Sequence, residues 1–171
     1  MKIVLAPECI IRRIERDERD SVWMLPNIKL NFPKLMARQE AGEIEWIGAF
    51  VGGRAIGQAV LKFRVKNGVE ELTGGKTANV DNLHVSHHMR NIGVGTALIT
   101  YAEKHCAECG FQYIGLGVNV EDNPRAYNLY LRLGFKNIGH SEYVSWDAYD
   151  DDGKVIGRDG ETCHYLIKPL R

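Results

Sequence analysis

The sequence predicts an α+β fold built on a mixed, mostly antiparallel central sheet. Two β-rich runs are joined by the glycine pair Gly52-Gly53, which is typical of a hairpin, and a later extended run leads through a glycine loop into an amphipathic helix. These runs are Glu45–Val51, Arg54–Val65 and Thr77–Val85. With 171 residues, 44% of them hydrophobic, the chain suits a single domain over residues 1–171.

The glycine loop carries Arg90, Gly93 and Gly95 and is followed by a helical pattern. The apolar positions of that pattern are Val94, Ala97, Leu98, Tyr101, Ala102, Cys106 and Cys109. A glycine-rich turn therefore opens onto a helix N-terminus, where unpaired N–H groups and the positive end of the helix dipole favour an anion. The expected ligand is a phosphate or a pyrophosphate.

Spacing excludes two other phosphate-binding motifs. A dinucleotide fingerprint that begins at Gly93 needs a third glycine where Leu98 stands. A Walker A motif that ends at Gly74–Thr77 needs a glycine in place of Glu70 and a helix where a strand is expected. The pattern that remains is R-x-x-G-x-G, from Arg90 to Gly95.

A second, short helix follows the extended run Tyr113–Val118. Asn123 is a suitable N-cap, Pro124 suits the first helical position, and Gly134 suits the position just after the helix. The apolar stripe between them is formed by Ala126, Leu129, Tyr130 and Leu133.

The R-x-x-G-x-G loop, together with the run Asn123–Ala126, then Tyr130, then Gly134-Phe135, resembles the signature of the GCN5-related N-acetyltransferase (GNAT) family. This resemblance implies a three-layer α/β/α acyl-CoA acyltransferase fold and acetyl-CoA as cosubstrate. It implies that the loop binds the pyrophosphate, through Arg90, Asn91, Gly93, Val94, Gly95 and Thr96. It also implies that the backbone of Leu83, His84 and Val85 pairs with the pantetheine arm, which Asn123 contacts.

The resemblance also assigns chemical roles. Tyr130 matches the position whose hydroxyl donates to the departing sulfur, and a main-chain N–H near Leu83–Val85 faces the thioester oxygen. Asp81 is the first candidate for the general base, ahead of Glu71 and His84. Two alternatives stay open: Asp81 as a salt-bridge partner, and a reaction without a side-chain base. No cysteine matches an acetyl-enzyme site, so direct attack by a primary amine is expected.

The acceptor is expected to be a small cationic amine. Carboxylates gather along the sequence before the central strand and in the late segment, namely Glu70, Glu71, Asp81, Glu142, Asp147 and Asp150–Asp152. The acidic turn Asp150–Asp152 equally suits a solvated hairpin tip. The alternative functions are a non-catalytic acyl-CoA-binding sensor or regulatory module, and a protein N-terminal or lysine acetyltransferase.

The composition of the chain limits the expected binding partners and the expected cellular location. Lys plus Arg and Asp plus Glu both number 22, so no positive field favours nucleic acid. No run reaches membrane-spanning length, and the apolar stretch Ile3–Ala6 is too short for a secretory signal, so a cytoplasmic protein is expected and a homodimer is left open. The C-x-x-C pair Cys106 and Cys109 has no second pair, so buried reduced thiols are expected and no metal site.

The remaining elements are predicted from local patterns. A first strand is expected around Ile10–Ile14, a helix start over Asp17–Leu25, and a short helix over Lys34–Glu40 after Pro33. Two late strands are expected at Phe135–Tyr143 and Cys163–Ile167, with turns at Asn67-Gly68, Asp150–Gly153 and Arg158–Gly160. By the resemblance, the segment Asn27–Gly42 borders the acceptor, with Trp23, Met24 and Phe32 as candidate contacts.

Overall fold

The computed structural model describes residues 8–63 and 69–171. The chain divides into two compact units, Met1–Ile114 with Leu170–Arg171, and Gly115–Pro169. The short apolar stretch Ile3–Ala6 and the turn predicted at Asn67-Gly68 lie outside the described residues.

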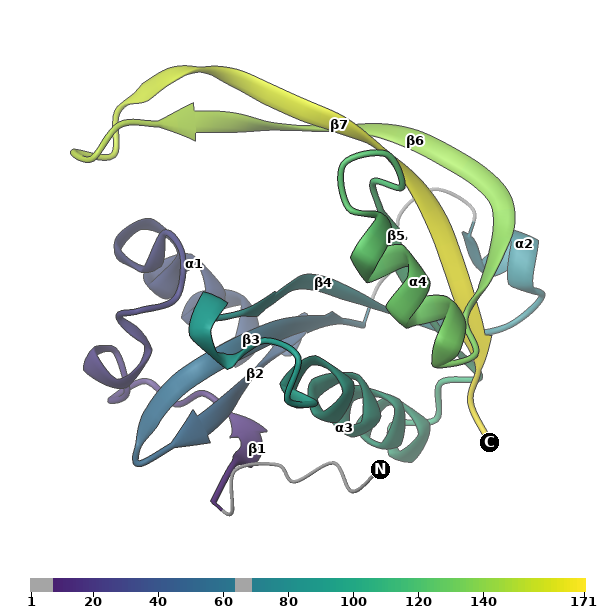
Figure 1. Ribbon diagram of the computed structural model, residues 1–171, viewed down its shortest axis with the longest axis horizontal. Helices are drawn as coiled ribbons and strands as arrows, with labels where there is room; N and C mark the ends of the chain where they lie inside the picture. The colour runs from purple at the N-terminus through teal and green to yellow at the C-terminus, as the bar shows by residue number, and fades with distance from the viewer. Residues whose placement is uncertain (1–7, 64–68) are drawn as a thin grey trace. The chain divides into compact units, whose positions relative to one another are not determined.

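The first unit is built on four strands (Figure 1), which are β1 (Ile10–Arg13), β2 (Ile44–Val51), β3 (Arg54–Lys62) and β4 (Thr77–Val85). They lie in the order β1-β2-β3-β4, and each is antiparallel to its neighbour. The hairpin predicted at Gly52-Gly53 is confirmed. Residues Ile44 to Phe50 of β2 are all buried, as expected of a strand that is covered on both faces.

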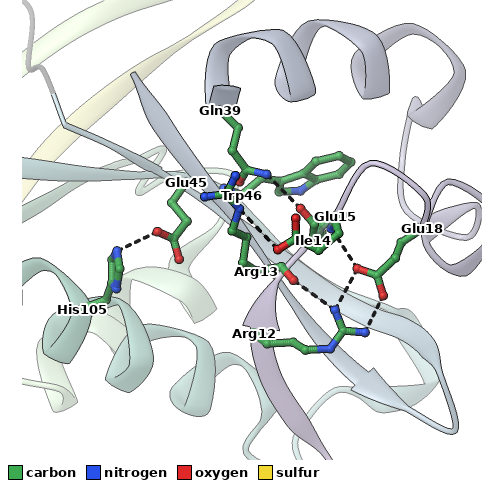
Figure 2. Close-up of polar contacts among 9 residues, drawn as sticks. All are labelled: Arg12, Arg13, Ile14, Glu15, Glu18, Gln39, Glu45, Trp46 and His105. Atoms are coloured by element: carbon green, nitrogen blue, oxygen red, sulfur yellow. Dashed lines mark hydrogen bonds and ion pairs between the residues drawn. The ribbon is translucent and has the colours of Figure 1, made fainter. Parts of the chain in front are cut away.

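Helices cover both faces of this sheet. On one face, α1 (Ile28–Glu40) places Phe32 edge-on against Trp46 of β2, with ring centroids 5.6 Å apart. On the other face, α3 (Val94–Glu108) places His105 2.7 Å from the carboxylate of Glu45 (Figure 2). Because neighbouring residues of a strand point to opposite faces, Glu45 and Trp46 contact different helices. The predicted three-layer α/β/α arrangement is therefore present within this unit.

A buried glutamine ties the first of these helices to the sheet. Gln39 of α1 donates its Nε2 to the carbonyl oxygen of Ile14 at 2.9 Å, and its Oε1 accepts the backbone N–H of Trp46 at 2.7 Å (Figure 2). The side chain of Gln39 is 4% exposed. Because both ends of the amide are satisfied, its burial carries little desolvation cost and fixes the position of α1 on β2.

Strand β4 contains a bulge close to its C-terminal end. Gln58 pairs with His84 and Val60 pairs with Asp81, so the single residue between them on β3 faces two residues on β4, Asn82 and Leu83. Asn82 has a left-handed backbone, with φ of 51°. A bulge of this kind bends the strand and redirects its side chains, and here it does so just before the glycine loop.

The second unit contains most of β5 (Tyr113–Val118), the helix α4 (Pro124–Arg132), and the long strands β6 (Lys136–Tyr149) and β7 (Val155–Pro169) (Figure 1). The strand order is β5-β7-β6, and β6 and β7 form an antiparallel hairpin. In all, the described residues form seven strands and four α-helices, with antiparallel pairing at β1–β2, β2–β3, β3–β4 and β6–β7. The predicted α+β class with a mostly antiparallel sheet is confirmed.

Two predictions about helices are wrong in detail, and one short helix is additional. The helix start predicted over Asp17–Leu25 is a single 3-10 turn at Asp20–Val22. Helix α1 begins at Ile28 rather than Lys34, so Pro33 lies inside the helix, where the backbone hydrogen bond that its N–H would have made is missing. The short helix α2 (Val69–Thr73), which precedes β4, is not predicted from the sequence.

The late hairpin is longer than its sequence pattern indicates. The turn predicted at Arg158–Gly160 is wrong, because these residues lie inside β7 and pair with residues of β6, Gly160 with Ser145 and Arg158 with Asp147. The turn predicted at Asp150–Gly153 is confirmed. There the Oδ1 of Asp150 accepts the backbone N–H groups of Asp152 at 3.0 Å and Lys154 at 2.8 Å.

Candidate active site

The loop between β4 and α3 has the backbone of an anion-binding turn. After a 3-10 turn at His87–Met89, the chain adopts left-handed conformations at Asn91 (φ 65°) and Gly93 (φ 92°). A residue with a side chain rarely occupies the conformation of Gly93, which explains the need for glycine there. Gly93 is the N-cap of α3, so the helix start predicted at Val94 is confirmed.

The first turn of α3 presents unpaired N–H groups. No side chain caps the helix, and the bond from the N–H of Ala97 to the carbonyl oxygen of Gly93, at 2.9 Å, is the first of the helical series. The N–H groups of Val94, Gly95 and Thr96 therefore have no acceptor within the helix. Together with the helix dipole, they fit the negatively charged oxygens of a pyrophosphate.

Arg90 folds back onto the end of β4. Its Nε donates to the carbonyl oxygen of Val85 at 2.9 Å. Ser86, which follows Val85, donates its N–H to the carbonyl oxygen of Ile56 in β3 at 2.8 Å. The backbone polar groups of Val85 therefore point to the other side of the strand, away from β3. The loop thus places a guanidinium against the C-terminal end of β4, at the residues that the family resemblance assigns to the pantetheine arm.

A cavity of about 170 Å³ lies within the first unit, beside the bulge of β4. We call it the amide cavity, because four of its lining residues carry a carboxamide: Asn27, Asn31, Gln58 and Asn82. The imidazole of His84 and apolar residues, Trp46 and Leu83 among them, complete the lining. No carboxylate, lysine or arginine belongs to this set of described residues. The cavity is therefore polar but uncharged.

His84 has an electrostatic environment that keeps it neutral. Partial burial lowers the pKa of its imidazole below the ordinary value of 6.5, and the positive charge of Arg90 lowers this pKa further. Protonated His84 is disfavoured, so the neutral imidazole predominates near neutral pH. A neutral imidazole in a cavity wall is able to accept a proton.

Asp81 is held by two neighbours. It forms an ion pair with Lys62 of β3 and accepts a hydrogen bond from the amide of Asn79. Asp81 is not among the residues that line the amide cavity. The structure therefore agrees with the alternative interpretation of Asp81 as a salt-bridge partner. Glu71, a weaker candidate, is exposed on α2.

The residues predicted on the second short helix lie in the second unit. Asn123 caps α4, since its Oδ1 accepts the N–H of Ala126 at 3.2 Å, and Pro124 occupies the first turn. The Tyr130 side chain is 7% exposed, and its ring lies edge-on to that of Phe135 with centroids 6.1 Å apart. Burial raises the pKa of the Tyr130 phenol to about 12, so the hydroxyl stays protonated and remains a donor.

The two cysteines of the C-x-x-C pair have different environments. Cys106 is buried, and burial raises the pKa of its thiol to about 12, as predicted for a structural thiol. Cys109 is exposed at the end of α3, so the prediction that it is buried is wrong: the helix ends there and the apolar stripe loses contact with the sheet. Within residues 8–63 and 69–171, no cluster of three or more His, Cys, Asp or Glu side chains could hold a metal ion.

Sequence reasoning missed most of the amide cavity. Asn27, Asn31 and Gln58 come from different elements, and only the fold brings them together. Trp23 and Met24, proposed as acceptor contacts, are exposed and do not line the cavity. Phe32 is buried in the core against Trp46. A signal was available at Asn27 and Asn82, because asparagine is among the non-glycine residues that most often adopt a left-handed backbone.

Comparison with known proteins identifies the class. The model of the Acetyltransferase (GNAT) family matches residues 10–135, and the chain therefore belongs to the GNAT acetyltransferase family. This confirms the resemblance read from the loop and from α4. The chain is an acetyl-CoA-dependent N-acetyltransferase of this family.

Solved structures share the fold at low sequence identity. An N-acetyltransferase from Staphylococcus aureus Mu50 is 12% identical, with a TM-score of 0.66 over 96% of this chain and 99% of that one. The ribosomal-protein-S18-alanine N-acetyltransferase from Escherichia coli is 16% identical, with a TM-score of 0.66 over 95% and 94%. A phosphinothricin acetyltransferase from Sinorhizobium meliloti in complex with AcCoA is 16% identical, with a TM-score of 0.64 over 95% and 88%.

No curated protein matches the chain in sequence. Of the helices formed by the described residues, none is both long and apolar enough to cross a membrane.

Proposed function

We propose that this enzyme acetylates the primary amine of a small molecule by direct attack of the amine on the thioester of acetyl-CoA. One observation carries the proposal: the uncapped N-terminus of α3, with free N–H groups at Val94, Gly95 and Thr96, opens from a loop that begins at the end of β4. We propose one N-acetyltransferase domain over residues 1–171. None of the cysteines Cys9, Cys106, Cys109 and Cys163 forms a disulfide in the described part of the chain, which suits the reducing cytoplasm that we propose as its location.

Acetyl-CoA, when bound, supplies the activated acetyl group. We assign the pyrophosphate to Arg90, Asn91, Gly93 and the first turn of α3, and the pantetheine arm to the β4 backbone at Leu83–Val85 with Asn123. A phenol with a pKa of about 12 is a poor proton donor to a thiolate, because the conjugate thiol has a pKa of only about 8.5. The proposed role of Tyr130 is therefore a hydrogen bond that stabilises the departing sulfur, rather than complete proton transfer.

The attacking amine must lose a proton, and two residues are candidates for the base. Sequence analysis favours Asp81. The amide cavity supports His84, which lines it, whereas Asp81 is paired with Lys62. We propose His84 as the first candidate, acting directly or through water, with Asp81 as the alternative.

Replacement of each candidate separates these roles. His84→Gln should lower kcat/KM about 100-fold at neutral pH, because a general base contributes about 10²- to 10⁴-fold. The base works in its neutral form, so wild-type kcat/KM should fall as the pH drops through the lowered pKa of His84. His84→Gln should remove this dependence and recover activity as the pH approaches the pKa of the amine itself. The measurement is the pH profile of kcat/KM.

Asp81→Asn is the matched variant in that experiment. If His84 is the base, Asp81→Asn keeps the acidic limb of the wild-type profile. If Asp81→Asn instead loses that limb while His84→Gln keeps it, the base is Asp81. An equal loss at every pH in both variants would assign both residues to structure or substrate positioning.

The preference for a cationic amine rests on the acidic side chains and is tested by salt. Asp151 and Asp152 are exposed at the β6–β7 turn, so a field from them would be screened over a Debye length of about 8–10 Å. If they attract an ammonium, the KM of the amine should rise about two- to three-fold between low and physiological ionic strength. Asn at positions 151 and 152 should abolish that rise. A KM that salt leaves unchanged would contradict a cationic preference.

The function itself is tested with a panel of amines, with release of free thiol from acetyl-CoA as the readout and mass spectrometry of the acetylated product. We expect turnover of at least one class of small primary amine. Acetyl-CoA binding without turnover of any amine or peptide would favour the alternative of a sensor or regulatory module. Turnover of peptides or protein N-termini alone would favour a protein acetyltransferase.

A further inference from the structure

The amide cavity contains one buried polar group whose orientation is fixed. Gln58 lies on β3, its side chain is 6% exposed, and its Oε1 accepts a hydrogen bond from the indole Nε1 of Trp46 at 2.9 Å. An indole N–H is only a donor, so the oxygen of the amide must face it. The orientation of the Gln58 amide therefore follows from its contact with Trp46.

The other end of the same amide has no hydrogen-bond partner among the described residues. The described residues provide no acceptor for the Nε2 of Gln58, although this side chain lines the cavity. Trp46 is fully buried and packs against Phe32, so it cannot turn to release the amide. The cavity thus holds an NH₂ group that is directed by a rigid neighbour and needs an oxygen acceptor.

The other residues that line the cavity restrict the kind of ligand that can offer this acceptor oxygen. Asn27, Asn31 and Asn82 carry groups that both donate and accept, and the described residues that line the cavity include no charged side chain that could neutralise an ion. An amide has the same two capacities and no charge, whereas a second ammonium or a carboxylate would lose hydration without a counter-ion. The cavity volume of about 170 Å³ suits a small molecule, such as an aminoacyl amide.

We propose that Gln58 is a specificity-determining residue, and that the acceptor is a primary amine bearing an uncharged carbonyl oxygen, as an aminoacyl amide does. This rests on the proposed function, because it assigns the acceptor to the cavity beside β4. Gln58 donates Nε2–H to the carbonyl oxygen of the acceptor, and Trp46 is the positioning residue that orients Gln58. An amine that lacks the oxygen would displace solvent from this donor without replacing its hydrogen bond, which strongly disfavours such an amine.

The test compares matched pairs of amines, such as alaninamide and an alkylamine of the same size without the carbonyl. Binding to the protein loaded with coenzyme A is measured by calorimetry, and kcat/KM with acetyl-CoA is measured in parallel. We expect the wild type to prefer the amide at least about 10-fold. Gln58→Glu keeps an oxygen for Trp46 but replaces the donor, so it should reduce this preference to about one. Gln58→Met, which cannot hydrogen-bond, should do the same.

The control is Gln112→Glu, an equivalent change at an exposed glutamine whose Oε1 accepts the N–H of Lys76, far along the sequence from the cavity residues. It should keep the wild-type preference. Equal affinity of wild type for both members of each pair, or no binding of either at millimolar concentration, would contradict the inference. The proposed function would survive that result if acetyl-CoA still binds and another small amine is acetylated, and would fail if acetyl-CoA does not bind or no small amine is acetylated.

Discussion

Gly95→Glu should abolish the binding of acetyl-CoA. Gly95 lies in the first turn of α3, where the N–H groups have no helical acceptor. A glutamate there is compatible with the helix, because a negative side chain stabilises a helix N-terminus. It would, however, place a negative charge where the pyrophosphate is expected. Two like charges about 4 Å apart cost about 4 kcal/mol at an effective dielectric constant of 20, so we expect the Kd to rise at least about 100-fold.

Thermal unfolding measures this effect. At about 100 times its Kd, a ligand of the native state adds about 2.7 kcal/mol, which corresponds to roughly 5–10 °C for a chain of this size. The wild type should show this shift with acetyl-CoA, and Gly95→Glu should not. Thr100→Glu, on the exposed side of α3 and beyond its first turn, carries the same charge and should keep the shift. A normal shift in Gly95→Glu would show that the loop does not bind the pyrophosphate.

Tyr130→Phe should lower kcat about 10- to 100-fold and leave the thermal shift by acetyl-CoA unchanged. The phenol stays protonated because burial raises its pKa to about 12, and a hydrogen bond to a charged group contributes about 1.5–3 kcal/mol. The sulfur becomes charged only as it departs, so the bond acts on the transition state rather than on binding. The ring contact with Phe135 remains in the variant.

Steady-state kinetics with a good acceptor, together with the thermal shift, tests this prediction. Tyr127→Phe on the same helix is the control, because it removes a phenol hydroxyl from a residue that the family signature does not include. It should retain kcat. Full activity of Tyr130→Phe would remove Tyr130 from the mechanism.

Local chemistry made the loop and its helix predictable from sequence. Gly93 adopts a left-handed conformation that glycine favours, and the apolar stripe of α3 has the period of a helix on a sheet. The cap at Asn123 and the proline at Pro124 likewise act on their neighbours along the chain. Features of this kind depend on a few adjacent residues, so a sequence pattern is sufficient to find them.

Features set by tertiary pairing could not be predicted in the same way. The segment Arg158–Gly160 has the composition of a turn, but its backbone pairs with β6 and continues the strand. The ion pair of Asp81 depends on the register of β3 with β4, which brings Lys62 to it. The fixed amide of Gln58 depends on Trp46 of the neighbouring strand. Each of these requires contacts between residues that are distant in sequence.

The most direct test of the account is a crystal structure of the protein with coenzyme A or acetyl-CoA bound. We expect the pyrophosphate oxygens to accept hydrogen bonds from the N–H groups of Val94, Gly95 and Thr96, with the pantetheine arm along the backbone of Leu83–Val85. The guanidinium of Arg90, which lies against the carbonyl oxygen of Val85, should then contact the ligand. A pyrophosphate bound elsewhere, with the first turn of α3 still facing solvent, would contradict the account.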